Sequence, residues 1–166
     1  KNQPQQEIAK FYTSSKHQSS GVTVKGMQGI LVRFAGCCNP VPGDDIVGFI
    51  SRGHGVTVHR KDCPNLKNAE DGRLIEVNWA NKDSSIYNAG IKVIGTSQID
   101  ILTSVASCVA QLKLEIVYTN GRVDNRTKQV VVDFNIRLND KHELESLITK
   151  IKQDSKIIDV YRTANK

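Results

Sequence analysis

The fold of the carboxy-terminal half is indicated by residues 130–138, which read VVVDFNIRL. Every second side chain of this stretch is apolar, and that period of two predicts a β-strand with one buried face. Asp140 and Glu143 follow at the spacing of a capping box, so a helix is expected to begin directly after the strand. The buried stripe of that helix is predicted at four positions: Leu144, Leu147, Ile148 and Ile151.

The same analysis, extended outward, gives further elements on both sides of this pair. Strands are predicted at 89–94, 114–119 and 157–161, with a turn near 120–121 or 124–125. Ser97 and Asp100 form a second capping box before a helix whose predicted stripe is Leu102, Val105, Ala106 and Val109. The order βαββαβ predicts an antiparallel four-stranded sheet with two helices on one face, the ferredoxin-like arrangement.

The amino-terminal half has the pattern of short strands and turns. Strands are expected at 22–24, 30–34 and 74–79, and a β-hairpin at 44–59 around the turn SRGHG of residues 51–55. Val56 and Val58 should face the core, which leaves Thr57 and His59 on the opposite face. Asp62 is expected to cap a short helical turn with Pro64 near its first position.

The predicted class is therefore α+β, with a small β-rich Cys/His module followed by a ferredoxin-like domain. We expect the module at 21–80, a linker at 81–87 and the second domain at 88–166. Residues 1–20 are expected to be the end of an upstream helical segment and a joint.

Composition permits a polyanionic partner without requiring one. The chain of 166 residues carries a net charge of +6. This charge is spread evenly, with 11 basic against 8 acidic residues up to residue 83 and 12 against 9 after it. Four cysteines are too few for a disulfide scaffold, which favours a reduced, cytoplasmic setting. No apolar run approaches the length needed to span a membrane.

Four side chains are candidate ligands of a structural Zn²⁺ ion: Cys37, Cys38, His59 and Cys63. Thiolate and imidazole donors suit tetrahedral zinc, and a sharp turn at Asn39 and Pro40 would let adjacent cysteines share one ion. Two alternatives stay open at this point. The cysteines could simply pack in a core, or a Cys–His pair could act as a nucleophile, although no catalytic elbow is evident. Cys108 is expected to be a small core residue of its helix.

Four candidate RNA-binding residues lie on or near the glycine-rich turn: Arg52, His54, Arg60 and Lys61. Grouped cations on such a projection suit contact with phosphates, because glycine lets the backbone come close. A solvated hairpin tip is the equally weighted alternative. The sequence shows no phosphate-cradling loop or carboxylate set for pyrophosphoryl transfer, so the chain itself is not expected to be an enzyme.

Residues 35–65 closely resemble the zinc-finger-like (RIS) module of long RelA/SpoT-type (p)ppGpp synthetase/hydrolases, and the second half is similar to the ACT domain of those proteins. The resemblance spans about residues 22–162. It implies a regulatory region that binds the ribosome near the A site, contacts 23S rRNA and helps to sense deacylated tRNA. It also implies that the region restrains catalytic domains upstream, and that Cys37, Cys38, His59 and Cys63 are the zinc ligands.

The chain departs from these families at several positions. Gly36 stands where the RIS family usually has a basic or polar residue. His54 stands where that family often has arginine. Amino-acid effectors of ACT domains bind between the first strand and helix, which here is Ser97, Gln98, Ile99 and Asp100. Asp100 stands where glycine would let a ligand carboxylate approach. The alternative function is an amino-acid-sensing ACT module, or one that forms a homodimer through its sheet edge.

Overall fold

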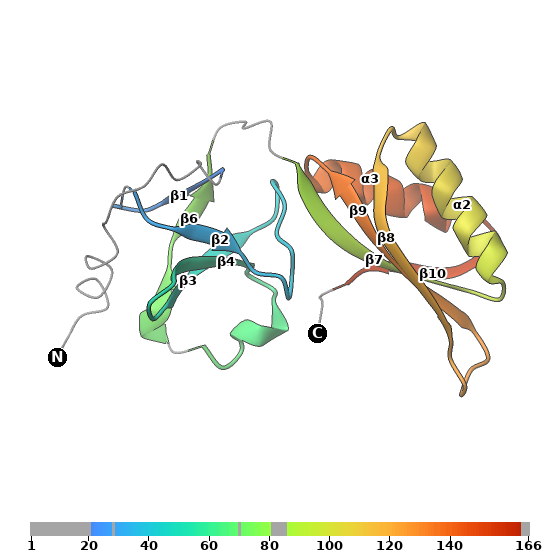
Figure 1. Ribbon diagram of the computed structural model, residues 1–166, viewed down its shortest axis with the longest axis horizontal. Coiled ribbons are helices and arrows are strands. Elements are labelled where there is room, and N and C mark those ends of the chain that lie inside the picture. The colour runs from blue at the N-terminus through green and yellow to red at the C-terminus, as the bar shows by residue number, and fades with distance from the viewer. Residues whose placement is uncertain (1–20, 28, 70, 81–85, 164–166) are drawn as a thin grey trace. The chain divides into compact units, whose positions relative to one another are not determined.

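The computed structural model describes residues 21–27, 29–69, 71–80 and 86–163, which belong to two compact units (Figure 1). The second unit comprises the chain from Ile86 onward together with the short segment Val41–Gly43. The predicted helical end at 1–20 and the linker residues 81–85 lie outside the described residues. None of the described helices combines the length and apolar character needed to cross a membrane.

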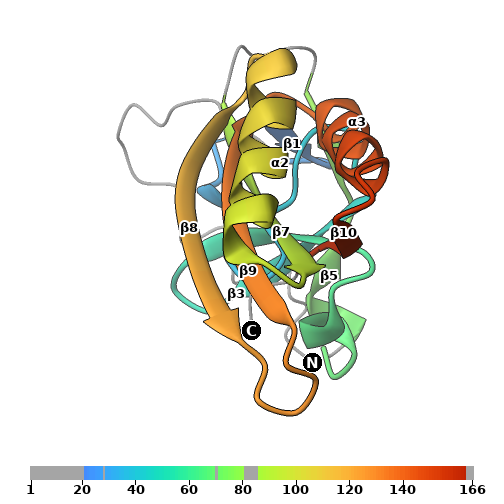
Figure 2. The same cartoon turned by 90° about the vertical axis from the view of Figure 1, so that its right-hand side faces the viewer.

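The second unit is the predicted βαββαβ domain. Its elements are β7 Tyr87–Gly95, α2 Gln98–Gln111, β8 Glu115–Val123, β9 Val130–Leu138, α3 Lys141–Lys152 and β10 Ile157–Arg162. The strands pair in the order β10-β7-β9-β8, and every pairing is antiparallel. Both helices cover the same face of the sheet (Figure 2). The ferredoxin-like arrangement is thereby confirmed.

The core of this unit lies between the sheet and the helices. Val132 and Ile136 of β9 are fully buried, as the alternation predicts. In α2 the buried stripe is rotated from the predicted one, because Ile101 and Ser104 are buried whereas Ala106 is exposed. Ile101, Val105 and Val109 follow one another at intervals of four residues, which places them on one face of the helix.

The turn between β8 and β9 forms at the second of the two predicted places. β8 continues to Val123, which pairs with Val130, so Asn120 and Gly121 lie inside the strand. Asp124 fixes the turn, because its carboxylate accepts the backbone N–H groups of residues 126 and 127 at 2.8 and 3.2 Å. A local side-chain acceptor at the end of a long paired strand thus determines where the hairpin reverses.

The predicted helix caps are present in part. Ser97 Oγ accepts the N–H of Asp100 at 3.3 Å, and an Asp140 oxygen accepts the N–H of Glu143 at 2.9 Å. The return bonds differ from a strict capping box. The Glu143 carboxylate accepts a hydrogen bond from the backbone N–H of Asn139, one residue before the cap. The Asp100 carboxylate accepts a hydrogen bond of 2.9 Å from the Lys156 side chain instead of from a backbone N–H.

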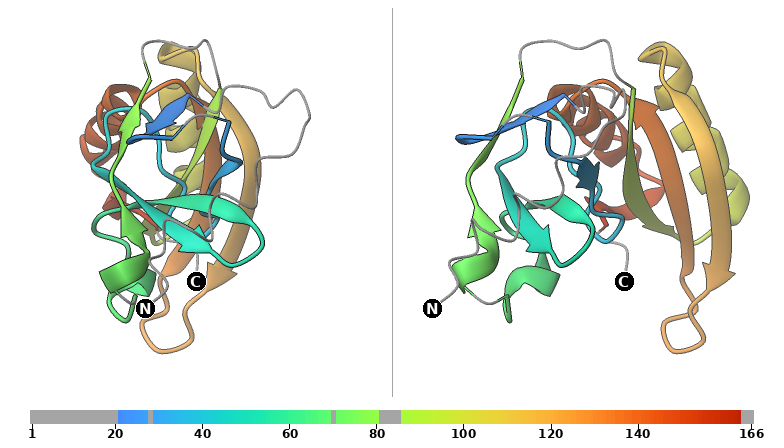
Figure 3. Two further views of the ribbon diagram at one scale, coloured as in Figure 1. Left: turned by 90° about the vertical axis from the view of Figure 1, so that its left-hand side faces the viewer. Right: turned by 60° about the vertical axis from the view of Figure 1, so that its left-hand side comes forward.

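The first unit is built from short strands (Figure 3). They are β1 Val22–Val24, β2 Val32–Phe34, β3 Ile46–Ser51, β4 Gly55–Arg60, β5 Leu74–Ile75 and β6 Val77–Trp79, with 3₁₀ turns η2 Pro64–Leu66 and η3 Asp71–Arg73. One sheet has the order β2-β4-β3-β5, and β1 pairs with β6 in a second sheet. The predicted strand at 74–79 is therefore divided. Its partner changes at Glu76, whose carbonyl accepts the N–H of Lys25.

One face of the first unit's sheet is buried in a compact cluster of aliphatic side chains: Val24, Ile46, Ile50, Val56, Val58 and Val77. The predicted orientation of β4 is confirmed, since Val56 and Val58 are both fully buried. At the margin, Trp79 stacks on Phe34 with ring centroids 5.6 Å apart. Its indole N–H donates to the carbonyl of Asp44 at 2.9 Å.

The cap expected at Asp62 is displaced by one residue. Cys63 occupies the N-cap position of η2, and Pro64 is the first residue of the turn, as predicted. The Asp62 carboxylate does not serve as a cap because both of its oxygens accept N–H groups of the Arg60 guanidinium, at 2.9 and 3.0 Å.

Gly48 lies where the core leaves no room for a side chain. A Cβ atom there would be 2.7 Å from methyl groups of both Ile75 and Val56. We expect Gly48→Ala to lower the free energy of unfolding of the first unit by about 1–3 kcal/mol, because overpacking forces the neighbours to shift. Trp79 is the chain's single tryptophan, so its fluorescence during urea unfolding reports this unit.

Gly72→Ala is the matched control, because a Cβ at Gly72 would have nothing within 4 Å. Its unfolding midpoint should stay within about 0.5 kcal/mol of the original. Equal effects of the two substitutions would contradict the packing described for β3.

A candidate metal centre and a cationic turn

Three separate segments bring the four candidate ligands together. Cys37 and Cys38 follow β2, His59 lies near the end of β4, and Cys63 begins η2. The chain turns sharply after Ala35, whose carbonyl accepts the N–H groups of Cys38 and Asn39 at 3.4 and 2.9 Å. Asn39 has φ of 42°, a left-handed conformation that asparagine tolerates better than most residues. The expected sharp turn beside the adjacent cysteines is therefore present.

The donor atoms lie at the separations of a tetrahedral ligand set. Cys37 Sγ is 3.4 Å from His59 Nδ1 and 3.6 Å from Cys63 Sγ, and Cys38 Sγ is 3.8 Å from His59 Nδ1. All four donor atoms lie within 4.8 Å of one another. Zinc–sulfur and zinc–nitrogen bonds of ~2.3 and ~2.0 Å at tetrahedral angles imply sulfur–sulfur and sulfur–nitrogen separations of about 3.8 and 3.5 Å. The four residues can therefore hold one metal ion with little rearrangement.

The ionisation of these groups without a cation argues against a nucleophilic thiol. Burial raises the pKa of the Cys38 thiol to about 12, although the backbone N–H of Arg60 acts in the opposite direction. Burial also raises the pKa of Cys63 and lowers the pKa of the His59 imidazole. An activated thiol needs a depressed pKa and a positioned base, so this environment disfavours covalent catalysis. A bound cation would instead stabilise the thiolates.

Packing alone accounts for only part of the arrangement. Cys38 and Cys63 are buried against Ala35 and Leu66, as the core interpretation expects. Packing does not require a half-buried Cys37 and an imidazole to direct their donor atoms at the same point. The cysteines are free, since the Cys37–Cys63 sulfur separation of 3.6 Å far exceeds a disulfide bond. Among the described residues, this is the only group of three or more such donors within reach of one ion.

The glycine-rich turn, at the other end of the β3–β4 hairpin from this centre, has a well-defined backbone. Gly53 and Gly55 both have φ of 78°. A Cβ at Gly55 would lie 2.3 Å from the carbonyl oxygen of Leu31, which accepts the N–H of Val56 at 2.9 Å. Glycine is therefore required at position 55 both by its conformation and by close contact with the neighbouring segment.

The four predicted RNA-binding cations are not presented equally. Arg52 and His54 at the tip are exposed, and so is Lys61. The Arg60 side chain is only 12% exposed and is paired in a fork with Asp62. The structure thus gives Arg60 a supporting role beside the metal centre. Asp62, which was expected to cap a helical turn, is instead the partner of Arg60, two residues earlier in the chain.

The predicted effector segment is already engaged within the second unit. Ser97 caps α2, and the Asp100 carboxylate is paired with Lys156. The amide of Gln98 approaches Gly121 so closely that a Cβ there would be 3.1 Å away. Ile99 is 70% exposed. Gln98 and Ile99 are therefore the exposed members of the segment, whereas Ser97 and Asp100 are partly buried and bonded within the unit.

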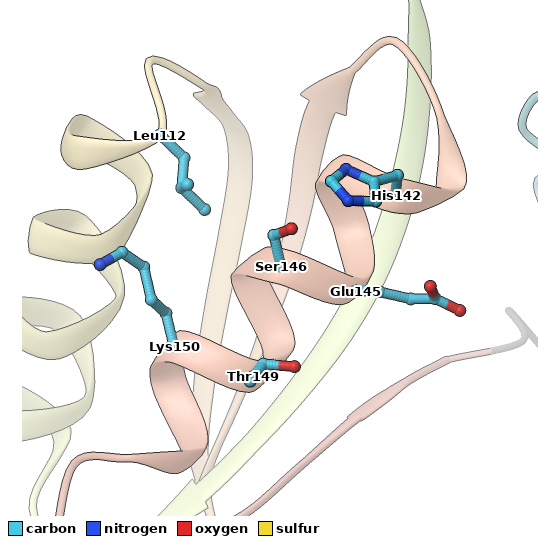
Figure 4. Close-up of a pocket in the computed structure, with 6 residues that line it drawn as sticks. All are labelled: Leu112, His142, Glu145, Ser146, Thr149 and Lys150. Atoms are coloured by element: carbon cyan, nitrogen blue, oxygen red, sulfur yellow. The ribbon is translucent and has the colours of Figure 1, made fainter.

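A shallow groove of about 400 Å³ lies between the end of α2 and the outer side of α3 (Figure 4). It is lined by Leu112, His142, Glu145, Ser146, Thr149 and Lys150. The Glu145 carboxylate forms an ion pair at 3.6 Å with Lys141, a residue that does not line the groove. The polar groups in Figure 4 do not converge on one point, so the groove offers no arrangement for chemistry. Cys108, which was expected in the core, is half-buried on α2, and burial raises the pKa of its thiol.

Comparison with known proteins assigns both units. The RelA/SpoT RIS domain model matches residues 22–80, and an ACT domain model matches residues 83–162. The bifunctional (p)ppGpp synthase/hydrolase RelA of Mycobacterium tuberculosis is 35% identical over 148 residues, and the GTP pyrophosphokinase of Escherichia coli is 28% identical over 158. These matches cover 87% and 92% of this chain but 20% and 21% of the relatives, so the chain spans about a fifth of their length.

A solved structure is similar to the second unit. The crystal structure of the ACT domain from the GTP pyrophosphokinase of Chlorobium tepidum covers 47% of this chain and 99% of its own. The sequence identity is 14% and the TM-score is 0.40.

The donor set predicts one tetrahedral cation per chain. Titration with Co²⁺, a spectroscopic probe for such sites, should saturate at one equivalent with intense thiolate-to-cobalt absorption and tetrahedral d–d bands. His59→Ala and Cys63→Ser should weaken binding at least tenfold, since each removes one ligand.

Cys108→Ser is the matched control, because it removes a thiol that belongs to the other unit. It should leave the stoichiometry and the spectrum unchanged. Octahedral bands, or full binding by Cys63→Ser, would rule out the four-ligand centre.

Proposed function

Because residues 22–80 are a RelA/SpoT RIS domain and residues 83–162 an ACT domain, we propose that this chain is the ribosome-binding regulatory region of a bifunctional (p)ppGpp synthetase/hydrolase of the stringent response. The matched fifth of the relatives is their RIS and ACT part. GTP pyrophosphokinase and hydrolase activity would then belong to catalytic domains elsewhere in the parent protein. The pairing of these two domains is the observation that carries the proposal.

Contact with 23S rRNA near the ribosomal A site is assigned to the cationic turn. Arg52 and His54 are exposed there, on a backbone held by Gly55 and by the bond between Val56 and Leu31, and Lys61 is exposed just beyond the other end of β4. A rigid support lowers the entropy lost when long cationic side chains engage phosphates. Arg60 contributes indirectly, because its ion pair with Asp62 holds the segment between His59 and Cys63.

The metal ion is proposed to be Zn²⁺ in a structural role. Three sulfurs and one nitrogen complete a tetrahedron, so no position stays open for a substrate or a catalytic water. The ion would join the segment after β2, the end of β4 and the start of η2, and so fix the end of the β3–β4 hairpin that lies opposite the cationic turn. A reducing cytoplasmic compartment would keep the three thiols available for the metal.

The proposed regulatory role depends on binding of the chain to the ribosome. In this proposal the chain binds the ribosome when deacylated tRNA occupies the A site, and it restrains the upstream catalytic domains at other times. Binding energy gained on the ribosome would then favour the unrestrained state, because a ligand shifts an equilibrium by its difference in affinity for the two states.

A second candidate function is association of two ACT domains. β8 is an edge strand with eight of its nine residues exposed, including Tyr118 at 60% and Val123 at 57%. Such an edge can pair with a second copy. Sedimentation of the chain with and without valine or isoleucine tests this function, since a monomer in both conditions excludes it.

The exposed cations at the two ends of the β3–β4 hairpin should determine ribosome binding. Replacing Arg52 and Lys61 together by Gln should weaken co-sedimentation with ribosomes at least ~10-fold at physiological salt. The slope of log affinity against log salt should also become shallower by about 2, because two phosphate contacts are lost.

Lys25→Gln combined with Lys152→Gln removes the same charge from exposed positions that do not belong to the β3–β4 hairpin. This control should bind ribosomes nearly as well as the original chain. Equal weakening by both pairs would mean that net charge, and not the turn, governs binding.

A further inference from the structure

The face of the first unit's sheet that points away from the core carries one continuous row of side chains. Arg33 pairs in register with Thr57, Thr57 with Phe49, and Phe49 with Leu74. These four residues, which we call the outer row, cross all four strands in the order β2-β4-β3-β5. None of them belongs to the buried aliphatic cluster on the opposite face.

Phe49 is the unusual member of the outer row. Its neighbours Gly48 and Ile50 on β3 are buried, whereas Phe49 is half-buried on the opposite side of the strand. A strand face of this kind normally carries polar residues, because an aromatic ring gains little there from burial. The Arg73 guanidinium lies over the ring, 5.9 Å from its centroid.

The surroundings of the ring are cationic and polar. Arg33 at one end of the outer row is exposed, and no residue of the row is acidic. Ser51 and Thr57 join their hydroxyls at 3.3 Å beside the ring. Ser51 directly precedes Arg52, so the proposed phosphate-contacting turn continues the same strand about 10 Å from Phe49.

An aromatic ring among guanidinium groups is the arrangement on which unpaired nucleobases stack. Base stacking uses the flat face of a ring or of an arginine, and neighbouring cations hold the phosphates of the same strand. A duplex would use only the cations, because its bases are already stacked. A protein partner would gain from the ring but would not need a row of four residues that contains an arginine and no acidic side chain.

We propose that the outer row, with Arg73, is a stacking platform for unpaired nucleotides of RNA. This inference rests on the proposed function and extends it from phosphate contact at the turn to base contact on the sheet. Phe49 and Arg73 would receive a splayed base. Arg33 and Arg52 would contact the phosphates on either side.

The direct test compares two labelled probes bound to the whole chain, measured by fluorescence anisotropy. One is a ten-nucleotide uridine RNA, and the other is an abasic ribose-phosphate strand of equal length and charge. The original chain should bind the uridine RNA at least ~5-fold more tightly, because one stacked base contributes about 5- to 100-fold. Equal affinities for the two probes would overturn the platform without any substitution.

Phe49→Leu should lower the affinity for the uridine RNA until it equals that for the abasic strand. The affinity for the abasic strand itself should stay unchanged. Phe49→Tyr should restore the preference, since tyrosine keeps the aromatic face. Arg33→Gln should weaken binding of both probes equally and lower the salt slope by about 0.7. Unchanged Trp79 fluorescence and metal content would show that these variants fold, as expected for residues outside the core cluster.

The outcomes separate this inference from the proposed function. Ribosome binding that depends on Arg52 and Lys61, together with equal affinity for both probes, would overturn the platform alone. Loss of ribosome binding in Phe49→Leu with an unchanged preference between the probes would place a ribosomal protein on this face, which also overturns it. A base preference that Phe49→Leu abolishes would support it, whatever part of the ribosome the turn contacts.

Discussion

The first unit depends on the convergence of four donor atoms from three segments of chain. A unit of about 60 residues buries a limited apolar area, and small domains of this size often need a metal or disulfides to supplement the core. Here the aliphatic cluster covers one face of the sheet, while the Cys/His group lies at the end of β4 and gathers the segments before and after it. These segments carry little regular structure of their own, so an ion bound by the four donors would fix them.

The strand alternation of β3 and β4 separates stability from recognition. Ile46, Gly48 and Ile50 point into the core, and the residues between them point outward. His59, a ligand of the candidate metal centre, lies at one end of that outward surface. Phe49 and the cationic turn lie toward the other end. A single hairpin therefore positions the proposed metal, stacking and phosphate contacts. The same rigidity that holds the ligands together would also hold the RNA-facing side chains.

Periodicity in the sequence was sufficient for the second unit, because β9 and the two helices have long apolar repeats and side-chain caps. Periodicity was less reliable in the first unit, where the hydrogen-bond and ion-pair partners of a segment cannot be read from its own apolar pattern. The division of residues 74–79 between two sheets depends on Lys25 bonding to Glu76, and the cap displaced from Asp62 depends on Arg60. The four donors could be named from residue type and spacing, but their tetrahedral separations required the fold. The outer row could not be predicted, since register across four strands is a tertiary property.

The central claim is that metal coordination holds the first unit together independently of the second. Denaturant unfolding should be followed by Trp79 fluorescence in zinc-loaded protein and in protein freed of metal by a chelator. The account predicts that metal removal lowers the Trp79 midpoint markedly, because ligand binding to the native state stabilises it. The later far-UV circular dichroism transition of the ACT domain should not move. An unchanged Trp79 midpoint in protein shown to be free of metal would contradict the account.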